Sequence, residues 1–320
     1  MKKILSIALC FALLATFAAG AAEFTPAQNV TFVVSSSPGG GSDAFARTIT
    51  NIIVSEKLAD INFIVNNLTD GNGEVSRLTV ATAGGRLANH TLLSMNSGDC
   101  GDMLDNTSNR IENFTPIATM AVDKQLLMIT PEGKYKSFKE ILDALAAGTP
   151  VVMSGSKGSD TTTVEALLEE IGYDMSQKKY IAYDSTGDAI TAILGNHVDV
   201  VIVKPGSAIE YAEAKSLIPV LALSDKRFSD VPVLADAPTL NEVDSKYKNV
   251  ERPIWRSVVA PGSMSPAAAK YWGDLMQKVT ETKAWAEYIE KNSLLRDYRS
   301  LADTKAYITA FEEQYLAAQE

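Results

Sequence analysis

The stretch Val33-Val34-Ser35-Ser36-Ser37-Pro38-Gly39-Gly40-Gly41-Ser42-Asp43 decides the fold. The apolar run Val30–Val34 before it has the composition of a buried strand. Apolar residues after it recur at the i, i+4, i+7 and i+8 spacing of one helix face, at Phe45, Ile49, Ile52 and Ile53. A strand, a Gly/Ser loop and a helix in this order predict an α/β sheet.

The same order recurs at Val151–Gly172, around the loop Ser154-Gly155-Ser156-Lys157-Gly158-Ser159-Asp160-Thr161. We interpret the two segments as one physical device used once in each half of the molecule. The other predicted strands are Ile61–Val65, His90–Met95, Gln125–Ile129, Pro150–Met153, Tyr180–Ala182, Val198–Val203 and Ile218–Leu223, and the predicted helices include Phe138–Ala147, Thr162–Ile171 and Pro266–Thr282.

The chain length predicts two lobes. About 300 residues exceed the size at which one hydrophobic core stops growing. We expect a two-lobed α/β protein, each lobe a mixed sheet flanked by helices, with a ligand cleft between the lobes. Residues 23–121 and 224–320 are assigned to the first lobe and 122–223 to the second. The chain is expected to cross between them near Thr119–Val122 and Leu221–Ser224.

The N-terminus predicts export. Lys2 and Lys3 precede the uncharged apolar run Ile4–Ala19, and small residues follow it, so residues 1–22 have the pattern of a cleaved signal peptide. The run is shorter than the about 20 residues of a membrane span, although a retained anchor is the alternative. Without the signal, Cys100 is left alone and cannot form an intramolecular disulfide.

The charge balance excludes one class of partner. The net charge of −10 becomes −12 (−10 minus 2) once Lys2 and Lys3 are removed. Binding nucleic acid requires neutralisation of phosphates by Lys and Arg, so we expect no nucleic-acid partner. An anionic ligand is still possible, because the nearest dipoles govern a buried site more than the total charge does. The mature chain has two histidines and one cysteine in separate segments, so no metal site is expected, and no cofactor.

The two Gly/Ser loops are candidates for anion binding. A helix N-terminus leaves backbone N–H groups unpaired and carries a partial positive charge. Glycines let this backbone approach an anion, and hydroxyls add donors, so two such ends can hold a carboxylate without arginine. The alternative is that Ser42 or Asp43 only caps its helix. Asp43 can face the cleft or pair with Arg47, and Lys157 is expected to be solvated.

An esterase reading uses Ser156 in Ser154-Gly155-Ser156-Lys157-Gly158, with Asp184 or Asp188 and then His197. A serine replaces the first glycine of the nucleophile elbow, and His197 falls in a helix-to-strand turn. A secreted serine hydrolase is therefore the least favoured function.

Several segments, in order along nearly the whole mature chain, resemble the substrate-binding proteins of tripartite tricarboxylate transporters, also called the Bug receptors. They are Pro38–Arg47, Phe114–Ala118, Gly155–Ser159, Tyr183–Ala189, Leu194–Asp199 and Trp255–Pro261. The resemblance implies a periplasmic binding-protein fold (type II-like) whose two loops grip a carboxylate, partly through water. It also implies delivery to integral membrane permease subunits. Ser36-Ser37 and Asp184 depart from the family pattern and predict a more polar site.

We therefore predict a periplasmic receptor for a small organic carboxylate that acts as a monomer and is not an enzyme. The alternative is a ligand-sensing receptor that signals to a membrane protein. The predicted ligand-binding residues are Ser37, Pro38, Gly39, Gly40, Gly41, Ser42, Asp43, Asn96, Ser97, Ser156, Gly158, Ser159, Thr161, Thr162, Tyr183 and Asp184.

Overall fold

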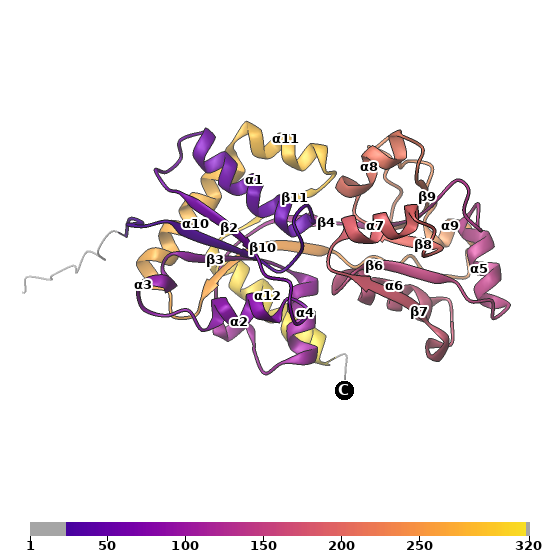
Figure 1. Cartoon of the computed structure of the whole chain (residues 1–320), viewed down its shortest axis with the longest axis horizontal. Helices are drawn as coiled ribbons and strands as arrows, with labels where there is room; N and C mark the ends of the chain where they lie inside the picture. The colour runs from indigo at the N-terminus through magenta and orange to yellow at the C-terminus, as the bar shows by residue number, and fades with distance from the viewer. Residues whose placement is uncertain (1–23, 318–320) are drawn as a thin grey trace, which may run out of the picture.

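The computed structural model describes residues 24–317, so the predicted signal peptide lies outside the described residues. Two mixed β-sheets, each flanked by helices, build two lobes that lie side by side (Figure 1). The predicted two-lobed α/β fold is confirmed. Between residues 24 and 317, no helix combines the length and the apolar character needed to cross a membrane.

The first sheet has six strands in the order β11-β4-β10-β3-β1-β2. β1 pairs in parallel with β2 and β3, whereas β10 is antiparallel to both β3 and β4. The strands are β1 (Val30–Val34), β2 (Phe63–Asn67), β3 (Thr91–Asn96), β4 (Phe114–Asp123), β10 (Ile254–Pro261) and β11 (Leu295–Arg299).

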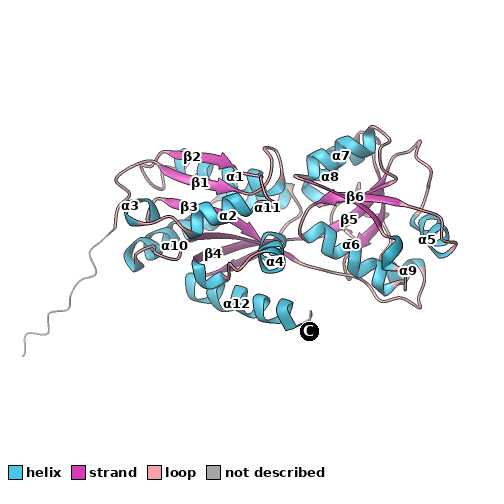
Figure 2. Cartoon of the chain, turned by 60° about the horizontal axis from the view of Figure 1, so that its bottom comes forward, coloured by secondary structure: helices cyan, strands magenta, loops and turns pink. Residues whose placement is uncertain are grey.

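Helices cover both faces of this sheet (Figure 2). One face packs against α1 (Gly41–Ser55), α10 (Pro266–Glu281) and α11 (Lys283–Lys291), in a core that includes Phe45, Trp272 and Trp285. The other face packs against α2 (Glu74–Ala81), α4 (Ser97–Asn106) and α12 (Leu301–Ala317), in a core that includes Cys100 and Trp255. The short helices α3 (Gly85–Ala88) and η1 (Ile111–Asn113) join strands at the periphery.

The second sheet has five strands in the order β7-β6-β8-β5-β9. They are β5 (Gln125–Ile129), β6 (Val152–Ser156), β7 (Lys179–Tyr183), β8 (Val200–Val203) and β9 (Ile218–Leu223). One face packs on α5 (Phe138–Ala146), α6 (Ser159–Glu170) and α9 (Leu240–Val243), with η2 (Met175–Gln177) after α6. The other face packs on α7 (Thr186–Leu194) and α8 (Pro205–Glu213).

The two Gly/Ser loops occupy equivalent places in the two sheets. β1 is the middle strand of the parallel set β2-β1-β3, and β6 is the middle strand of β7-β6-β8. Each strand leads directly into a helix, α1 or α6. Because ligands bind at the carboxyl ends of such strands, this arrangement directs both loops to the region between the lobes.

The second crossing between the lobes lies later than Leu221–Ser224, and residues 224–250 do not belong to the first lobe. Phe228 and Leu234 pack in one core of the second lobe, and Leu240 and Val250 in the other. The chain therefore returns to the first sheet just before β10. The sequence did not reveal this because the apolar residues are spread through irregular structure without a helix or strand period.

The strands β10 and β11 were not predicted, and the C-terminal region was expected to be helical with breaks. β11 is an edge strand whose side chains are largely exposed, so its composition carries little signal. Pro116 interrupts the apolar run of β4, which is a central strand. It is tolerated because it lies opposite Val259 at a register shift, where the ladder is already broken.

A buried ion pair joins the strands at the crossings. Asp123 is the last residue of β4, and the Arg256 guanidinium on β10 bonds to its carboxylate. The two side chains are 3% and 6% exposed. Removing one partner of such a pair leaves a buried, uncompensated charge, which costs more than the intact pair contributes.

We expect Asp123→Asn to lower the free energy of unfolding by about 3–5 kcal/mol. Adding Arg256→Met to this variant should recover part of the loss, because the orphaned charge is removed with it. Urea unfolding of the wild type, both single variants and the double variant measures the coupling. A double variant that loses the sum of the two single losses would show that the charges do not act as a pair.

Candidate binding cleft between the lobes

Three neighbouring cavities that share lining residues lie along the boundary between the lobes. The central one has a volume of about 50 Å³, and the two that flank it are each about 220 Å³. Gly41, Lys204 and Arg256 line both the central cavity and one neighbour, and Asp102 and Ser159 line both the central cavity and the other. One water needs about 10–15 Å³, so the central cavity has room for a few waters or a compact group.

Asp43 holds the first loop in shape. Its carboxylate accepts from the Gly39 N–H at 2.9 Å, from Arg47 Nε at 2.9 Å and from Asn67 Nδ2 at 3.0 Å. Burial alone would raise the pKa of Asp43, but the donors Arg47, Gly39 and Asn67 lower it below its ordinary value. Of the two alternatives for Asp43, facing the cleft or pairing with Arg47, the structure has the pair. The Asp43 carboxylate also holds the loop through the Gly39 N–H.

The N-terminus of α1 opens into the cleft. The helix begins at Gly41, and its N-cap Gly40 supplies no side-chain cap, so backbone N–H groups in the first turn are available to a ligand. In contrast, the N-terminus of α4 is closed by its own residue, because the Asn96 side chain accepts from the N–H groups of Gly98 and Asp99 at 2.7 and 3.1 Å.

Gly41 is required by its neighbour Arg256. A Cβ at position 41 would lie 2.7 Å from Arg256 Nη2, and the guanidinium is held in place by Asp123. The glycine therefore lets a cation approach the first turn of α1, where the helix end is already positive. Because Asp123 balances the Arg256 charge, the guanidinium can lie against this helix end.

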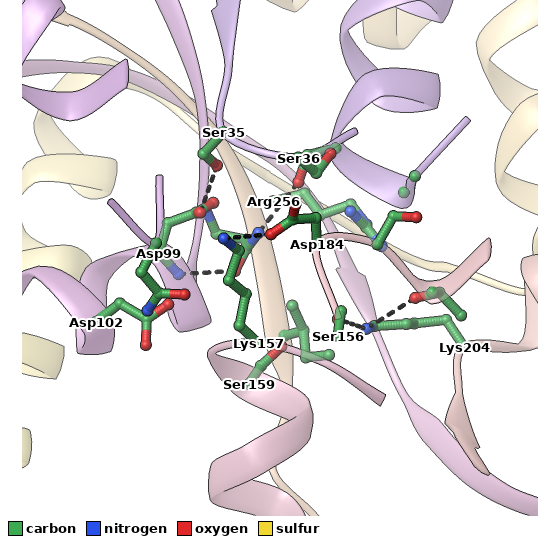
Figure 3. A pocket seen from close by; sticks show the side chains of 18 residues that line it. Ser35, Ser36, Asp99, Asp102, Ser156, Lys157, Ser159, Asp184, Lys204 and Arg256 are labelled. Carbon is green, nitrogen blue, oxygen red and sulfur yellow. Dashed lines mark hydrogen bonds and ion pairs between the residues drawn. The ribbon is translucent and has the colours of Figure 1, made fainter. Parts of the chain in front are cut away.

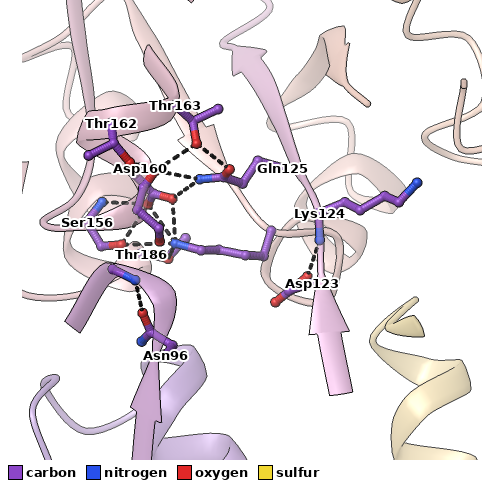
Figure 4. Close-up of polar contacts among 12 residues, drawn as sticks. Asn96, Asp123, Lys124, Gln125, Ser156, Asp160, Thr162, Thr163 and Thr186 are labelled. Carbon is purple, nitrogen blue, oxygen red and sulfur yellow. Dashed lines mark hydrogen bonds and ion pairs between the residues drawn. The ribbon is translucent and has the colours of Figure 1, made fainter. Parts of the chain in front are cut away.

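Ser156 and Lys204 belong to a buried polar network in the second lobe (Figures 3 and 4). The Ser156 hydroxyl donates to Asp160 Oδ2 at 2.6 Å and accepts from Lys204 Nζ at 2.9 Å. Lys204 Nζ is also 2.6 Å from Asp160 Oδ1, and Gln125 Nε2 donates to the same oxygen at 2.5 Å. Lys204 is thus placed at the cleft with its charge already balanced.

The second loop is shorter than predicted. β6 continues through Ser156 and α6 begins at Ser159, so Lys157 and Gly158 alone form the turn. Gly158 has a φ of 77°, which favours glycine, and it gives α6 no side-chain cap. The helix therefore begins three positions before its expected start at Thr162, and Ser159 and Thr161 are helical residues of the first turn.

Lys157 is not solvated as expected. Its side chain is 19% exposed, and Nζ lies 2.6 Å from Asp184 Oδ1. The same nitrogen donates to the Thr69 carbonyl of the first lobe at 3.2 Å. A lysine in a Gly/Ser loop gives no signal for this pairing, because Asp184 comes from a different strand-to-helix turn.

The other side of the central cavity is acidic. On α4, Asp99 accepts from the Ser35 hydroxyl at 2.5 Å and from the Asn96 N–H at 3.0 Å. The next acid on this helix, Asp102, accepts a hydrogen bond from the Asn72 side chain. Within residues 24–317, no lysine or arginine nitrogen forms a salt bridge with Asp102. Burial, with repulsion from Asp99, raises the pKa of Asp102 to about 7.

Three buried polar atoms of residues that line these cavities have no hydrogen-bond partner among the described residues. Arg256 Nε and Ser36 Oγ belong to the central cavity, and Trp255 Nε1 belongs to a flanking one. Buried polar groups in proteins are nearly always paired, so two unpaired atoms at the central cavity make it the candidate binding site.

The structure brings part of the predicted set to the cleft. Gly40, Gly41, Ser42, Asn96, Ser156, Ser159 and Asp184 line the central cavity, and Gly39, Ser97, Gly158 and Thr162 line its neighbours. Ser37, Pro38, Asp43, Thr161 and Tyr183, all described residues, line none of the three cavities. The lining residues that the sequence did not indicate are Ser35, Ser36, Asn72, Asp99, Asp102, Lys157, Ser185, Thr186, Lys204, Ile254 and Arg256.

The serine hydrolase arrangement is not assembled. Ser156 is bonded to Asp160 and Lys204, whereas His197 is exposed in the turn before β8. The His197 ring lies against Gly195 of its own turn, where a Cβ would be 3.1 Å from Nε2. His197 therefore does not take the place of the triad histidine beside the Ser156 hydroxyl, which is bonded to Asp160 and Lys204 instead.

The family model described as "Tripartite tricarboxylate transporter family receptor" matches residues 47–314 of this chain. The chain belongs to this family. Its members are receptors, and the chain is accordingly a solute-binding receptor and not an enzyme. The resemblance noted in the sequence is confirmed.

Comparisons with individual proteins agree with this assignment. The chain is 24% identical over 241 residues to the UPF0065 protein in the tcbD–tcbE intergenic region of Pseudomonas sp. strain P51, covering 74% of this chain and 69% of that protein. MatC from Rhodopseudomonas palustris with bound malate superimposes with a TM-score of 0.79 at 19% identity, covering 92% of this chain and 100% of that one. The periplasmic binding protein BugD gives 0.80 at 19% identity, covering 91% and 96%. These structures establish the shared fold.

We expect Asp102→Asn to stabilise the ligand-free receptor above pH 7. The native state holds the Asp102 proton with a pKa of about 7, against an ordinary value of 3.8, so it binds more protons than the unfolded chain between these values. The wild type therefore loses stability as the pH rises from about 4 to 7, by on the order of 4 kcal/mol. The variant avoids this loss.

Thermal unfolding of both proteins from pH 4 to pH 8 tests this. The melting temperature of the variant should exceed that of the wild type at pH 8, and the difference should vanish near pH 4. Asp105→Asn on the same helix is the matched control, because that carboxylate is bonded to the Tyr315 hydroxyl. A difference in melting temperature between wild type and Asp102→Asn that stays constant from pH 4 to pH 8 would contradict the raised pKa of Asp102.

Proposed function

We propose that this receptor is exported to the periplasm, captures a small organic carboxylate in the cleft between its lobes, and delivers it to integral membrane permease subunits. The observation that carries the proposal is the pair of orphaned donors, Arg256 Nε and Ser36 Oγ, beside the uncapped N-terminus of α1. Malate bound to MatC, which shares the fold, supports a carboxylate as the ligand class.

In the proposed grip, the carboxylate lies at the first turn of α1, where the N–H groups of Gly41 and Ser42 meet the cleft. Arg256 Nε and Ser36 Oγ lie in the same cavity and add donors. Hydrogen bonds to a charged group contribute about 1.5–3 kcal/mol each, so a few suffice for micromolar binding.

The second lobe contributes Ser156 and Lys204 through their shared network. Because Asp160 already neutralises Lys204, this side offers a polar surface and not a bare cation. A ligand held this way is not trapped in a deep ion pair. This suits a receptor that must release its ligand to a permease.

Small residues allow the lobes to close on each other. A Cβ at Gly98 of the first lobe would lie 2.3 Å from the Ser159 backbone nitrogen of the second, and a Cβ at Gly206 would lie 2.4 Å from Asn292 Oδ1. These contacts are across the boundary between the lobes. They place Gly98 where any side chain would hold the cleft open.

A thermal-shift series of small mono-, di- and tricarboxylates tests the ligand class. A carboxylate present at 100 times its Kd should stabilise the native state by about 2.7 kcal/mol, seen as a rise in melting temperature. Arg256→Met should abolish the rise, because it removes the orphaned donor from the cleft. Absence of any rise across the whole series would refute the proposed ligand class.

Gly98→Ala should weaken carboxylate binding by more than about 10-fold, since the closed arrangement then costs at least about 1.4 kcal/mol. Alanine favours the helix α4, so the fold itself should persist. Gly84→Ala is the control, because a Cβ at that position meets no atom within 4 Å. Titration calorimetry measures affinity, and small-angle scattering measures compaction on ligand addition. Equal affinity and equal compaction in the two variants would exclude Gly98 as the closure contact.

A further inference from the structure

A lysine of the second lobe makes a hydrogen bond to the backbone of the first lobe. Lys157 lies in the turn between β6 and α6, and its Nζ donates to the Thr69 carbonyl at 3.2 Å. Thr69 follows β2, an edge strand of the first sheet. Because the two residues belong to different lobes, this bond exists only while the lobes are in contact.

The acceptor is held in place by its own loop. The Thr69 carbonyl also accepts from the Gly73 N–H at 3.0 Å. In the same loop, the Arg77 guanidinium donates to the Asn72 carbonyl at 3.0 Å, and Asn72 lines the central cavity. The first lobe therefore presents the Thr69 carbonyl at the cleft in a fixed position.

The donor is held in place within the second lobe. The Lys157 backbone N–H donates to the Tyr183 carbonyl at 2.9 Å, and Nζ lies 2.6 Å from Asp184 Oδ1 (Figure 3). This ion pair restricts the rotamers of a long side chain that would otherwise be free. The bond to Thr69 therefore has less conformational entropy to overcome.

Glycines let the two lobes approach closely beside this lysine. Gly158 follows Lys157, and a Cβ at position 158 would lie 3.0 Å from the Cα of Gly98 in the first lobe. The backbones of the two lobes thus meet directly. A larger residue at either glycine position would hold Lys157 away from Thr69.

We propose that Lys157 is a latch between the lobes, which stabilises the closed receptor through the Thr69 carbonyl and thereby sets how long a bound carboxylate is retained. A hydrogen bond from a charged donor favours the closed arrangement by about 10- to 150-fold. Lys157 is then a positioning residue and not the anchor of the ligand. This inference rests on the proposed capture of a carboxylate between the lobes and adds the group that keeps them together.

The latch can open without leaving a buried charge unpaired. When the lobes part, Lys157 keeps Asp184, whose side chain is 51% exposed, and the Thr69 carbonyl keeps the Gly73 N–H. An ion pair with one partner in each lobe would instead separate two charges on opening, at a much larger cost. The closed state is therefore favoured and still readily reversed.

Spin labels in the two lobes of the full mature receptor measure opening directly, in the absence of any ligand. Cysteines replace Leu87 on α3 of the first lobe and Leu194 on α7 of the second, which are 61% and 42% exposed. Cys100 is buried and stays unlabelled. Lys157→Met should raise the ratio of open to closed receptor by about 10-fold or more, seen in the distribution of distances between the labels.

Two further variants separate the latch from a general loss of charge or of folding. Lys157→Arg keeps a long, charged donor and should restore most of the closed population. Lys178→Met is the matched control, because Lys178 pairs with Glu165 within the second lobe. It removes the same charge and one ion pair, and it should keep the distances of the wild type.

Release rates separate the latch from a direct contact between Lys157 and the ligand. Malate, succinate and propionate are the probes, and stopped-flow fluorescence measures their dissociation. Lys157→Met should speed the release of each probe that binds by the same factor, about 10-fold or more, because the Thr69 carbonyl is its partner in every case. A direct contact predicts factors that differ between the probes and unchanged distances in the ligand-free receptor.

The outcomes separate the latch from the proposed function. Unchanged distances in ligand-free Lys157→Met, or an equal opening in Lys178→Met, overturn the latch and leave the carboxylate receptor standing. Opening in Lys157→Met alone supports the latch. If the wild type then binds no carboxylate at all, the proposed ligand class is overturned but the latch is not.

Discussion

The buried pair of Asp123 and Arg256 links the joint between the lobes to the cleft. Asp123 ends β4 where the chain leaves the first sheet, and Arg256 follows the return of the chain into β10. Because both strands pair with each other, the two crossings are fixed side by side. Arg256 also lines the cleft and forces a glycine at position 41. The same ion pair therefore fixes the joint between the lobes and shapes the cleft at the first turn of α1.

In the second lobe, a hydrogen-bond network holds the polar side chains of the cleft in place. Asp160 lies in the first turn of α6, where a carboxylate is favoured by the helix end, and it gathers Ser156, Gln125 and Lys204 around one buried charge. The network reaches from the β6 turn to the residue before α8. It positions Lys204 at the cleft and fixes the Ser156 hydroxyl. A site built from such fixed groups loses little conformational entropy on binding.

The fold could be predicted from local pattern, because strand, Gly/Ser loop and helix occur together in the sequence. Val30–Val34, Gln125–Ile129 and Ile218–Leu223 were predicted with their observed bounds. The loops of the site were also visible, since glycine at positions 40, 41 and 158 is needed for close backbone approach or positive φ. The Asp43–Arg47 pair followed from helical spacing.

The charged half of the site could not be predicted, for a physical reason. Lys204 lies 44 residues from Asp160, and Arg256 lies 133 residues from Asp123, so each pair exists only after the sheets form. Asp99 and Asp102 occupy a helix whose composition suggests an ordinary solvated face. The spacing of three places them on one side of that helix, but the second lobe must close over them before this matters. Local sequence patterns carry no information about contacts between the two lobes.

The balance of charges explains why the proposed grip can be both selective and reversible. Cations that are already paired attract any anion weakly, because their field is largely cancelled at the distance of the ligand. Selectivity then depends on the buried polar atoms that have no partner among the described residues, Arg256 Nε and Ser36 Oγ at the central cavity. A site built to pair such groups rejects an analogue that leaves one of them unpaired far more strongly than it rejects a change in size. Opening of the lobes returns water to both groups at once, so the ligand loses its advantage as soon as the cleft opens.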